Sequence, residues 1–372
     1  STGASQTCAF VGGTFNNQLT NVVDLNTPDG AQQNTPGGQN LMPHNNAQSG
    51  FVSKTIVETA TKIMTVSWSV GILSQNTAST TVNDVAHDGD GGLYVVGVFT
   101  GTVNIKDGKG AAFPVTSQGT ATSDGFFLKL DKDGGLRHVV VLRGLKANTL
   151  TSVQYGGKVG TRERVVLTGS YDGTVAELWS VTKTKLVLTC DAAASNNADD
   201  RNHGVSFEID YQVGVDGQVV GDVAPRWALF VHGGAETGAN PAGAAYKSSA
   251  IKGDTGGAYI TGGMYGATAS YRLKTYFSGA ACTNTVTTEF CTGSVENIHS
   301  SGLRDAWVAK VGPHQSAAGD SIFGLVWIKA LGGDAGESTT GITHDAVNDA
   351  LCQAIIENEV EVDPVFLSLG VT

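Results

Sequence analysis

The sequence predicts an all-β fold, a β-propeller of about five blades with four antiparallel strands each, in which the first and last blades are incomplete. Glycine contributes 50 of the 372 residues and charged residues only 15%, a composition that disfavours long helices. Short runs rich in Val, Ile, Thr and Tyr alternate with clusters of Gly, Asp and Asn, which is how strands and turns appear in a sequence. These runs also recur along the chain, which is typical of a repeat protein.

Four kinds of strand make up the repeat. The first ends in glycine and occurs as LYVVG (93–97), VVLTG (165–169), AYITG (258–262) and, more weakly, CAFVG (8–12) and ALCQA (350–354). The second occurs as SGFVSKT (49–55), DGFFLKL (124–130), VSFEIDY (205–211), DAWVAKV (305–311) and DPVFLSL (363–369). The third often opens on Trp and ends in glycine, as WSVG (68–71), HVVVLRG (138–144), WALFVHGG (227–234) and WIKALGG (327–333). The fourth is rich in Ser and Thr, as TTVNDVAHD (80–88), TLTSVQY (149–155), AAYKSSAI (244–251) and STTGITHD (338–345).

The repeat has a period of about 70 to 95 residues, measured between equivalent glycines, and about four strands per period indicate one propeller blade. A single domain spanning 1–372 would then contain units at 1–72, 73–145, 146–234, 235–333 and 334–372. The first unit lacks its opening strand and the fifth lacks its Trp-to-Gly strand. Three explanations are open: irregular end blades closed by a Cys8–Cys352 bridge or by local pairing, missing strands that lie outside these 372 residues, or completion by a neighbouring copy. Because one small sheet buries too little apolar area to be stable alone, the blades are expected to pack face to face. This packing, rather than ligand binding, is the expected role of the recurring aromatic residues, Phe51, Trp68, Phe126, Phe207, Trp227, Trp307 and Trp327.

The segments WIKALGG…GITHD, DVAHDGDGGLYVVG (84–97) and DAWVAKV resemble three parts of one known pattern. The chain is similar in these parts to the SBBP-type seven-bladed-propeller repeat of secreted and cell-surface proteins. That resemblance implies a β-propeller and an extracellular or surface location, but it implies no shared reaction and no catalytic residues. The chain departs from the pattern through long insertions at 18–48, 172–202, 266–302 and 312–321, and through its degraded last unit.

The net charge of −11 excludes two classes of partner, since nucleic acids and anionic membrane surfaces demand clustered Lys and Arg. The chain contains no apolar run of the roughly 18 to 20 residues that span a bilayer, so no membrane insertion is expected. Its start at Ser1 fits removal of a signal peptide or of a larger precursor, and fits a trimmed chain equally well.

The five cysteines suggest disulfides in an oxidising compartment. Cys282 and Cys291 lie nine residues apart across a Thr-rich loop, a spacing that suits a local disulfide, with two free thiols as the alternative. Cys8 and Cys352 fall in the same strand of the repeat near opposite ends of the chain, and a bridge between them would join the ends. Because the count is odd, internal pairing cannot be complete, and the state of Cys190 is open.

Asp/Gly turns are the most conspicuous polar feature. Asp88 and Asp90 in HDGDGG, and Asp131 and Asp133 in LDKDGG, are weak candidates for calcium, which favours clustered oxygen ligands. The favoured interpretation is structural, since Asp bonds its own backbone in tight turns while glycine takes positive φ. Neither turn is followed by the bidentate acid that usually closes a calcium loop.

Other chemistry has little support in the sequence. The eight histidines form no HExxH or other zinc spacing, and neither a GxSxG nucleophile elbow nor a phosphate-binding loop is present. The similar AHD (86–88) and THD (343–345) segments follow from repeat symmetry. Propeller glycosidases use carboxylates near the central axis, and the corresponding candidates are Asp84, Asp88 and Asp345, with Glu208 less favoured.

We therefore expect a secreted or surface-displayed protein with a structural or adhesive role rather than an enzymatic one. It could be the repeating subunit of a filament or sheath whose incomplete end blades and odd cysteine join copies to one another. The expected partners are further copies of the chain, or other surface proteins and glycans, and no catalytic residue or cofactor is expected beyond the weak calcium candidates. The alternative is a carbohydrate-binding or carbohydrate-cleaving propeller with its site at the axial mouth.

Overall fold

The chain is an all-β protein, as the sequence predicts. The structure is a computed structural model, which describes residues 6–16, 47–58, 64–118, 122–144, 147–172, 176–180, 185–187, 202–214, 219–233, 251–252, 258–265, 268–275, 290–292, 298–299, 304–315, 321–331, 337–345, 350–357, 360–361 and 365–368. In these ranges 26 strands are found and no helix. The described part of the chain accordingly contains no helix that could span a membrane.

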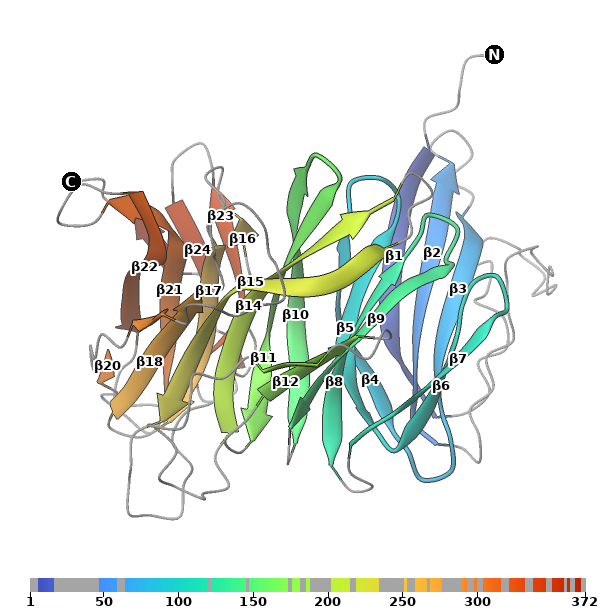
Figure 1. The fold of residues 1–372 in the computed structure, drawn as a ribbon, viewed down its shortest axis with the longest axis horizontal. Helices are drawn as coiled ribbons and strands as arrows, with labels where there is room; N and C mark the ends of the chain where they lie inside the picture. Colours follow the sequence, from blue (N-terminus) through green and yellow to red (C-terminus); the bar gives the residue numbers. More distant parts are fainter. Residues whose placement is uncertain are drawn as a thin grey trace. The chain divides into compact units, whose positions relative to one another are not determined.

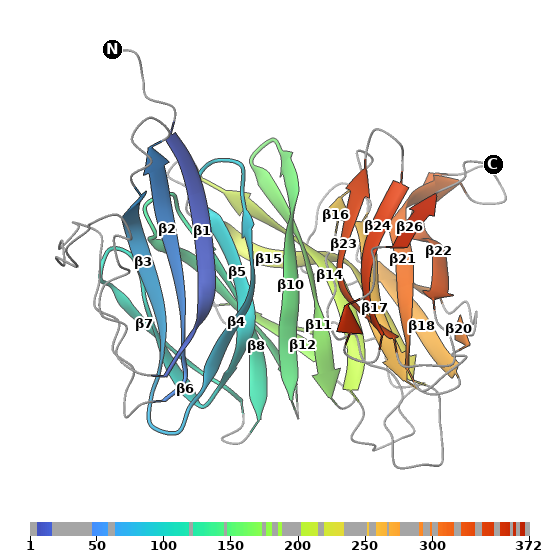
Figure 2. The same cartoon turned by 180° about the vertical axis from the view of Figure 1, so that it is seen from behind.

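The chain divides into two compact units, Ser1–Val141 and Leu142–Thr372. The first unit contains two antiparallel sheets, whose strands lie side by side in both views (Figure 1; Figure 2). One has the order β1-β2-β3-β6-β7, with β1 (Gln6–Phe15), β2 (Ser49–Glu58), β3 (Met64–Ser74), β6 (Thr102–Lys106) and β7 (Ala112–Thr116). The other is six-stranded, with the order β4-β5-β8-β9-β12-β13, and contains β4 (Thr80–His87), β5 (Leu93–Thr100), β8 (Ser123–Leu130), β9 (Leu136–Gly144), β12 (Ala176–Ser180) and β13 (Lys185–Val187). The last three residues of β9, together with β12 and β13, belong to the second unit.

The second unit contains three further antiparallel sheets. The third sheet has the order β10-β11-β14-β15-β18-β19, with β10 (Asn148–Val159), β11 (Arg162–Asp172), β14 (Asn202–Val213), β15 (Val219–Gly233), β18 (Thr268–Thr275), β19 (Phe290–Thr292), and β20 (Ile298–His299) beside β18. The fourth consists of β16 (Ile251–Lys252), β17 (Ala258–Tyr265), β21 (Arg304–Gln315) and β22 (Ser321–Leu331). The fifth pairs β23 (Glu337–Asp345) with β24 (Ala350–Glu357), which is followed by β25 (Val360–Glu361) and β26 (Val365–Ser368). The β12–β13 hairpin belongs to the second sheet, through the pairing of β12 with β9.

The predicted strands occur in the predicted order in every sheet. Counting only described strands, the first sheet lacks an opening strand and the fifth lacks a Trp-to-Gly strand, as the sequence suggests. Residues 244–250 of the predicted opening strand of the fourth sheet lie outside the described residues, and only β16 follows them. We call the Ser/Thr-rich strands β4, β10 and β23 the opening strands, because each is the first strand of its sheet.

Three inserted segments pair with a sheet that precedes them in the chain. One is the β12–β13 hairpin, which lies between β11 and β14 in the sequence, although β12 pairs with β9 of the second sheet. The β6–β7 hairpin lies between β5 and β8 in the sequence, but β6 pairs with β3 of the first sheet. In the same way β18 lies between β17 and β21, but pairs with β15 of the third sheet. Residues 266–302 are predicted only as an insertion, because the partner of β18 is a strand of the preceding repeat and no local pattern indicates that pairing.

Two irregularities recur between sheets and show that the repeats share a backbone plan. Each opening strand has a register shift next to the residue that pairs with the repeat glycine of the following strand, which is Gly97, Gly169 or the equivalent Ala354. The shifts lie between Val82 and Asp84, between Leu150 and Ser152, and between Thr339 and Gly341. The Trp strands carry a second shift, so that one extra residue precedes Trp68, Trp227 and Trp327. Such bulges bend a strand and re-aim its side chains, and here they set the direction of each Trp.

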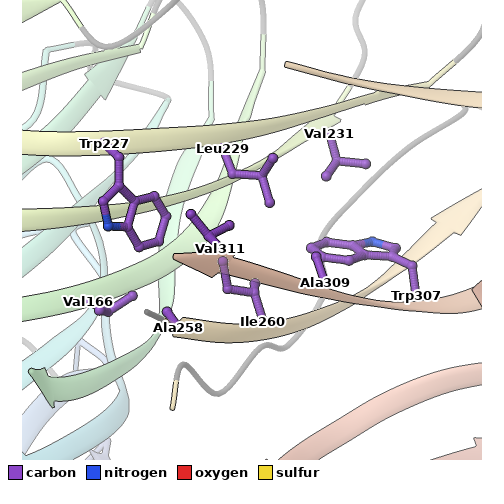
Figure 3. Close-up of a cluster of buried hydrophobic side chains, with 9 residues drawn as sticks. All are labelled: Val166, Trp227, Leu229, Val231, Ala258, Ile260, Trp307, Ala309 and Val311. Atoms are coloured by element: carbon purple, nitrogen blue, oxygen red, sulfur yellow. The ribbon is translucent and has the colours of Figure 1, made fainter. Parts of the chain in front are cut away.

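The aromatic residues pack between strands and between sheets. An alanine Cβ at Gly97 would lie 2.6 Å from the Phe126 ring, and one at Gly262 would lie 2.6 Å from the Trp307 ring, so each ring covers a glycine of the neighbouring strand. Figure 3 shows side chains of β15 facing side chains of β17 and β21 in one buried cluster, which joins the third and fourth sheets. The cluster contains Val166, Trp227, Leu229, Val231, Ala258, Ile260, Trp307, Ala309 and Val311. This arrangement agrees with the expected packing role of Trp227 and Trp307.

Candidate functional site

Three Asp turns of the first unit share one geometry. In each, a carboxylate oxygen accepts hydrogen bonds from the backbone amides two and four residues later, at 2.7 to 3.0 Å. The amide of the Asp also donates to the carbonyl four residues later, at 2.9 to 3.2 Å. The fourth residue of each turn is a glycine at positive φ, namely Gly91 (93°), Gly110 (87°) and Gly134 (78°). The turns occupy residues 88–92, 107–111 and 131–135, and we call them the Asp-turn cluster.

The turn at 131–135 lies beside the other two: a Cβ at Gly91 would be 3.2 Å from Lys132 Cβ, and hydrogen bonds join it to the turn at 107–111. The Gly108 amide donates to the carbonyl of Gly134 at 2.9 Å, and the Leu136 amide donates to Asp107 Oδ2 at 3.2 Å. The last turn also contacts the first sheet, because Trp68 Nε1 donates to the carbonyl of Lys132 at 2.9 Å. The Asp-turn cluster therefore links the two sheets of the first unit.

The second carboxylate oxygens of Asp88 and Asp131 face cations. Asp88 is 5% exposed and pairs through Oδ2 with the buried ammonium of Lys129. Asp131 Oδ2 lies 2.8 Å from Lys109 Nζ and 2.7 Å from Arg137 Nη2. Burial raises the pKa of Asp88, but the Lys129 charge and the hydrogen bonds from Lys129 and the turn amides outweigh burial, and the pKa lies below its usual value. The pKa of Asp131 is lowered in the same way, since the Lys109, Gly135 and Asp133 donors and the Arg137 charge outweigh burial.

These lowered pKa values predict acid sensitivity of the first unit. Because the folded state holds Asp88 charged, its stabilising contribution is complete above the unfolded pKa of about 4 and is lost as the pH falls through the lower folded pKa. At neutral pH, Asp88→Asn should lower the free energy of unfolding by about 3 kcal/mol, since Lys129 stays buried without its counter-charge. Urea denaturation between pH 7 and pH 2.5 would measure both effects. A variant as stable as the wild type, with the same loss in acid, would contradict this role.

The calcium candidates lie in two of the three turns. Asp88 and Asp131 supply the carboxylates that hold the turns, whereas the side chains of Asp90 and Asp133 are exposed. Within the described residues, no group of three or more His, Cys, Asp and Glu side chains could hold a metal ion. The geometry shows the structural use that the sequence favours, and calcium binding remains a weak prediction. The turn at 107–111 was not predicted, although DGKGA carries the same signal, an Asp followed three residues later by glycine.

Besides Asp88, two of the candidate axial carboxylates have described side chains, one in each unit. Asp84 Oδ1 accepts a hydrogen bond from the Val85 amide at 2.8 Å within β4, in the first unit. Glu208, on β14 of the second unit, is 4% exposed, and accepts hydrogen bonds from Arg226 Nη1 at 2.6 Å and Trp227 Nε1 at 2.8 Å. The side chain of Asp345 lies outside the described part of the chain.

Two further buried acids lie near Glu208 on the same sheet. Asp210 Oδ1 lies 2.6 Å from Arg162 Nε, and Glu163 Oε2 accepts a hydrogen bond from the Tyr211 hydroxyl at 3.1 Å. Both acids are at least nine-tenths buried, and such groups are stable only when they are paired. These contacts join β11 to β14, so the acids act as cross-strand connections. The sequence suggests none of these pairs, because each joins residues of strands separated by a long insertion.

The structure describes one cysteine thiol. Cys8 on β1 is free and exposed. Its predicted bridge to Cys352 would join β1 to β24 of the other unit, and it remains a prediction. Cys291 lies on β19, opposite Lys274 of β18, but its predicted partner Cys282 and the unassigned Cys190 fall outside the described ranges.

No protein-family model matches the chain, and no curated protein matches its sequence. The fold and the contacts above define a class of structure, an all-β repeat of antiparallel sheets whose buried acids serve as turn caps and cross-strand ties.

Proposed function

We propose that the five sheets are blades of a β-propeller and that the protein is a non-enzymatic structural or adhesive component of an extracellular or cell-surface assembly. Two contacts between sheets support the blade arrangement: the buried cluster of the third and fourth sheets, and the hydrogen bond from Trp68 to the Asp-turn cluster. Both join the face of one sheet to the next sheet along the chain, which is how propeller blades pack. The resemblance to SBBP-type repeats points the same way.

The observation that carries the structural role is the use of the buried acids. Asp88, Asp131 and Glu208 each bind at least one cation and at least one backbone amide or indole N–H. A catalytic carboxylate in a glycosidase needs access to substrate, and its partner carboxylate must stand a few ångströms away. Carboxylates that are already hydrogen-bonded in turns or paired with cations on neighbouring strands favour a scaffold over an enzyme.

We further propose that the protein assembles with copies of itself, because among the described strands the first and fifth sheets each have one strand fewer than a full repeat. Negative-stain images and sedimentation of the purified protein should then show oligomers or filaments that grow with concentration. A protein that stays monomeric at all concentrations would contradict the assembly. A single strong hit in a glycan-array or hydrolysis screen would favour the alternative, a carbohydrate-binding or carbohydrate-cleaving propeller.

A further inference from the structure

The free edge of β1 is the least protected strand edge of the first sheet. Ten consecutive residues of β1 pair with β2 without a register shift, and the other edge of β1 has no partner among the described strands. Its sequence, QTCAFVGGTF, contains no charged residue and no proline. Proteins normally protect an exposed edge with charges, proline or bulges, because an unprotected edge pairs with other strands. The opposite edge of this sheet, β7, carries Pro114.

The strands equivalent to β1 in three other sheets are covered on both edges. β5, β11 and β17 each pair with one strand on either side. The residue before the repeat glycine is fully buried in all three, with 0% exposure of Val96, Thr168 and Thr261. The equivalent Val11 is 50% exposed. β1 therefore has the sequence of an interior strand and the exposure of an edge.

The repeat glycine gives a second, independent indication. At Gly97 and Gly169 an alanine Cβ would lie 2.0 Å from a backbone carbonyl oxygen of the opening strand. Pairing with an opening strand therefore requires glycine at these two positions. At Gly12 the nearest atoms to such a Cβ are methyl carbons of Val82 and Val85, at 2.9 and 3.3 Å. Position 12 therefore has the glycine that pairing with an opening strand requires, although no described strand pairs with this edge of β1.

We propose that the free edge of β1 binds a strand of a second copy of this chain, in the position of the missing opening strand. This inference rests on the proposed self-assembly and identifies the surface that performs it. The best donor is β23, an opening strand with a register shift between Thr339 and Gly341 and with a partner, β24, on one edge only among the described strands. Paired with β1, it would join the fifth sheet of one copy to the first sheet of the next. Such a contact between two different surfaces is heterologous, and it extends into a filament unless the rotation between successive copies closes a ring.

Charge placed on this edge tests the proposal. Val11→Lys and Thr14→Lys alter exposed positions of β1, and Phe113→Lys alters a 37% exposed position on β7, at the other edge of the same sheet, as a matched control. Each lysine on β1 should weaken self-association roughly tenfold or more, because a buried lysine in a paired strand must lose its hydration. Sedimentation velocity over a concentration series measures the association, and circular dichroism verifies that each variant is folded. A synthetic peptide of residues 337–345 should also dissociate the assemblies, whereas a scrambled peptide should not.

The outcomes separate this inference from the proposed function. If the wild type assembles and the β1 variants assemble equally well, or if Phe113→Lys weakens assembly as much as they do, the edge of β1 is not the interface, although self-assembly stands. If the β1 variants fail and the peptide of 337–345 has no effect, β23 is not the donor. If the wild type never assembles, both the proposed assembly and its interface are wrong.

Discussion

Replacing Gly97 by alanine should lower the free energy of unfolding of the first unit by roughly 2–4 kcal/mol. The added Cβ would lie 2.0 Å from the Thr81 carbonyl oxygen and 2.6 Å from the Phe126 ring. A side chain can rotate away from such a clash, but the carbonyl belongs to the backbone of β4, which is fixed by its pairing with β5. Either the bulge in β4 must move or the pairing beside it must break. Urea denaturation followed by circular dichroism measures the loss.

Gly12→Ala is the matched control for this experiment. It makes the same change at the equivalent position of the first sheet, where the nearest atom is the Val82 Cγ1 methyl at 2.9 Å. Because a valine side chain can shift more easily than a strand carbonyl, the variant should lose about 1 kcal/mol or less. Equal losses at Gly97 and Gly12 would mean that the opening strand does not set the requirement for glycine.

The sequence predicts the sheets well because the same strand pattern, which is weak in any one repeat unit, recurs in several units. One stretch such as AYITG is compatible with several kinds of local structure. Similar stretches recur at a regular period, and each is followed by a strand with a large apolar residue. This recurrence predicts that the glycine-ending strand pairs with the strand that follows it. The structure has this pairing, with Gly97 opposite Phe126 and Gly262 opposite Trp307. Alternation of apolar residues with a period of two also predicts which strands are buried.

The parts that the sequence did not predict depend on contacts between distant residues. The pairing of β18 with β15 and the ion pair of Arg162 with Asp210 join segments separated by insertions of variable length. Extra residues such as Arg226 in the bulge before Trp227 leave no local pattern, since a bulge changes the pairing of two strands rather than the composition of either. Two of the three turns of the candidate site were predicted from the sequence, because an Asp followed three residues later by glycine is a local motif. Its Lys129 and Arg137 partners lie on other strands, and no spacing indicated them.

Trp227→Ala should have the largest effect in the second unit, a loss of roughly 3–5 kcal/mol. The ring is fully buried in the cluster that joins the third and fourth sheets, so its removal leaves a cavity. Trp227→Phe keeps most of the ring and removes the hydrogen bond from Nε1 to Glu208 Oε2, so it should cost only about 1–3 kcal/mol. The control is Trp179→Ala on β12, a half-buried ring beside the Arg143 guanidinium, where a loss of about 1 kcal/mol is expected. If Trp227→Phe costs as much as Trp227→Ala, the indole acts through its hydrogen bond and not through packing.

Hydrogen exchange of the same variant tests whether neighbouring sheets stabilise one another. Trp227 lies on β15, which is hydrogen-bonded to β14 and β18, whereas β17 and β21 belong to the fourth sheet. The cluster contains Ala258 and Ile260 of β17 and Val311 of β21, so a cavity at Trp227 removes contacts from a sheet to which β15 has no backbone bonds (Figure 3). Because sheets of a repeat protein depend on their neighbours for burial, amide protection of β17 and β21 should fall together with that of β14. Loss of protection confined to the third sheet would show that the sheets fold independently, and would contradict the blade arrangement.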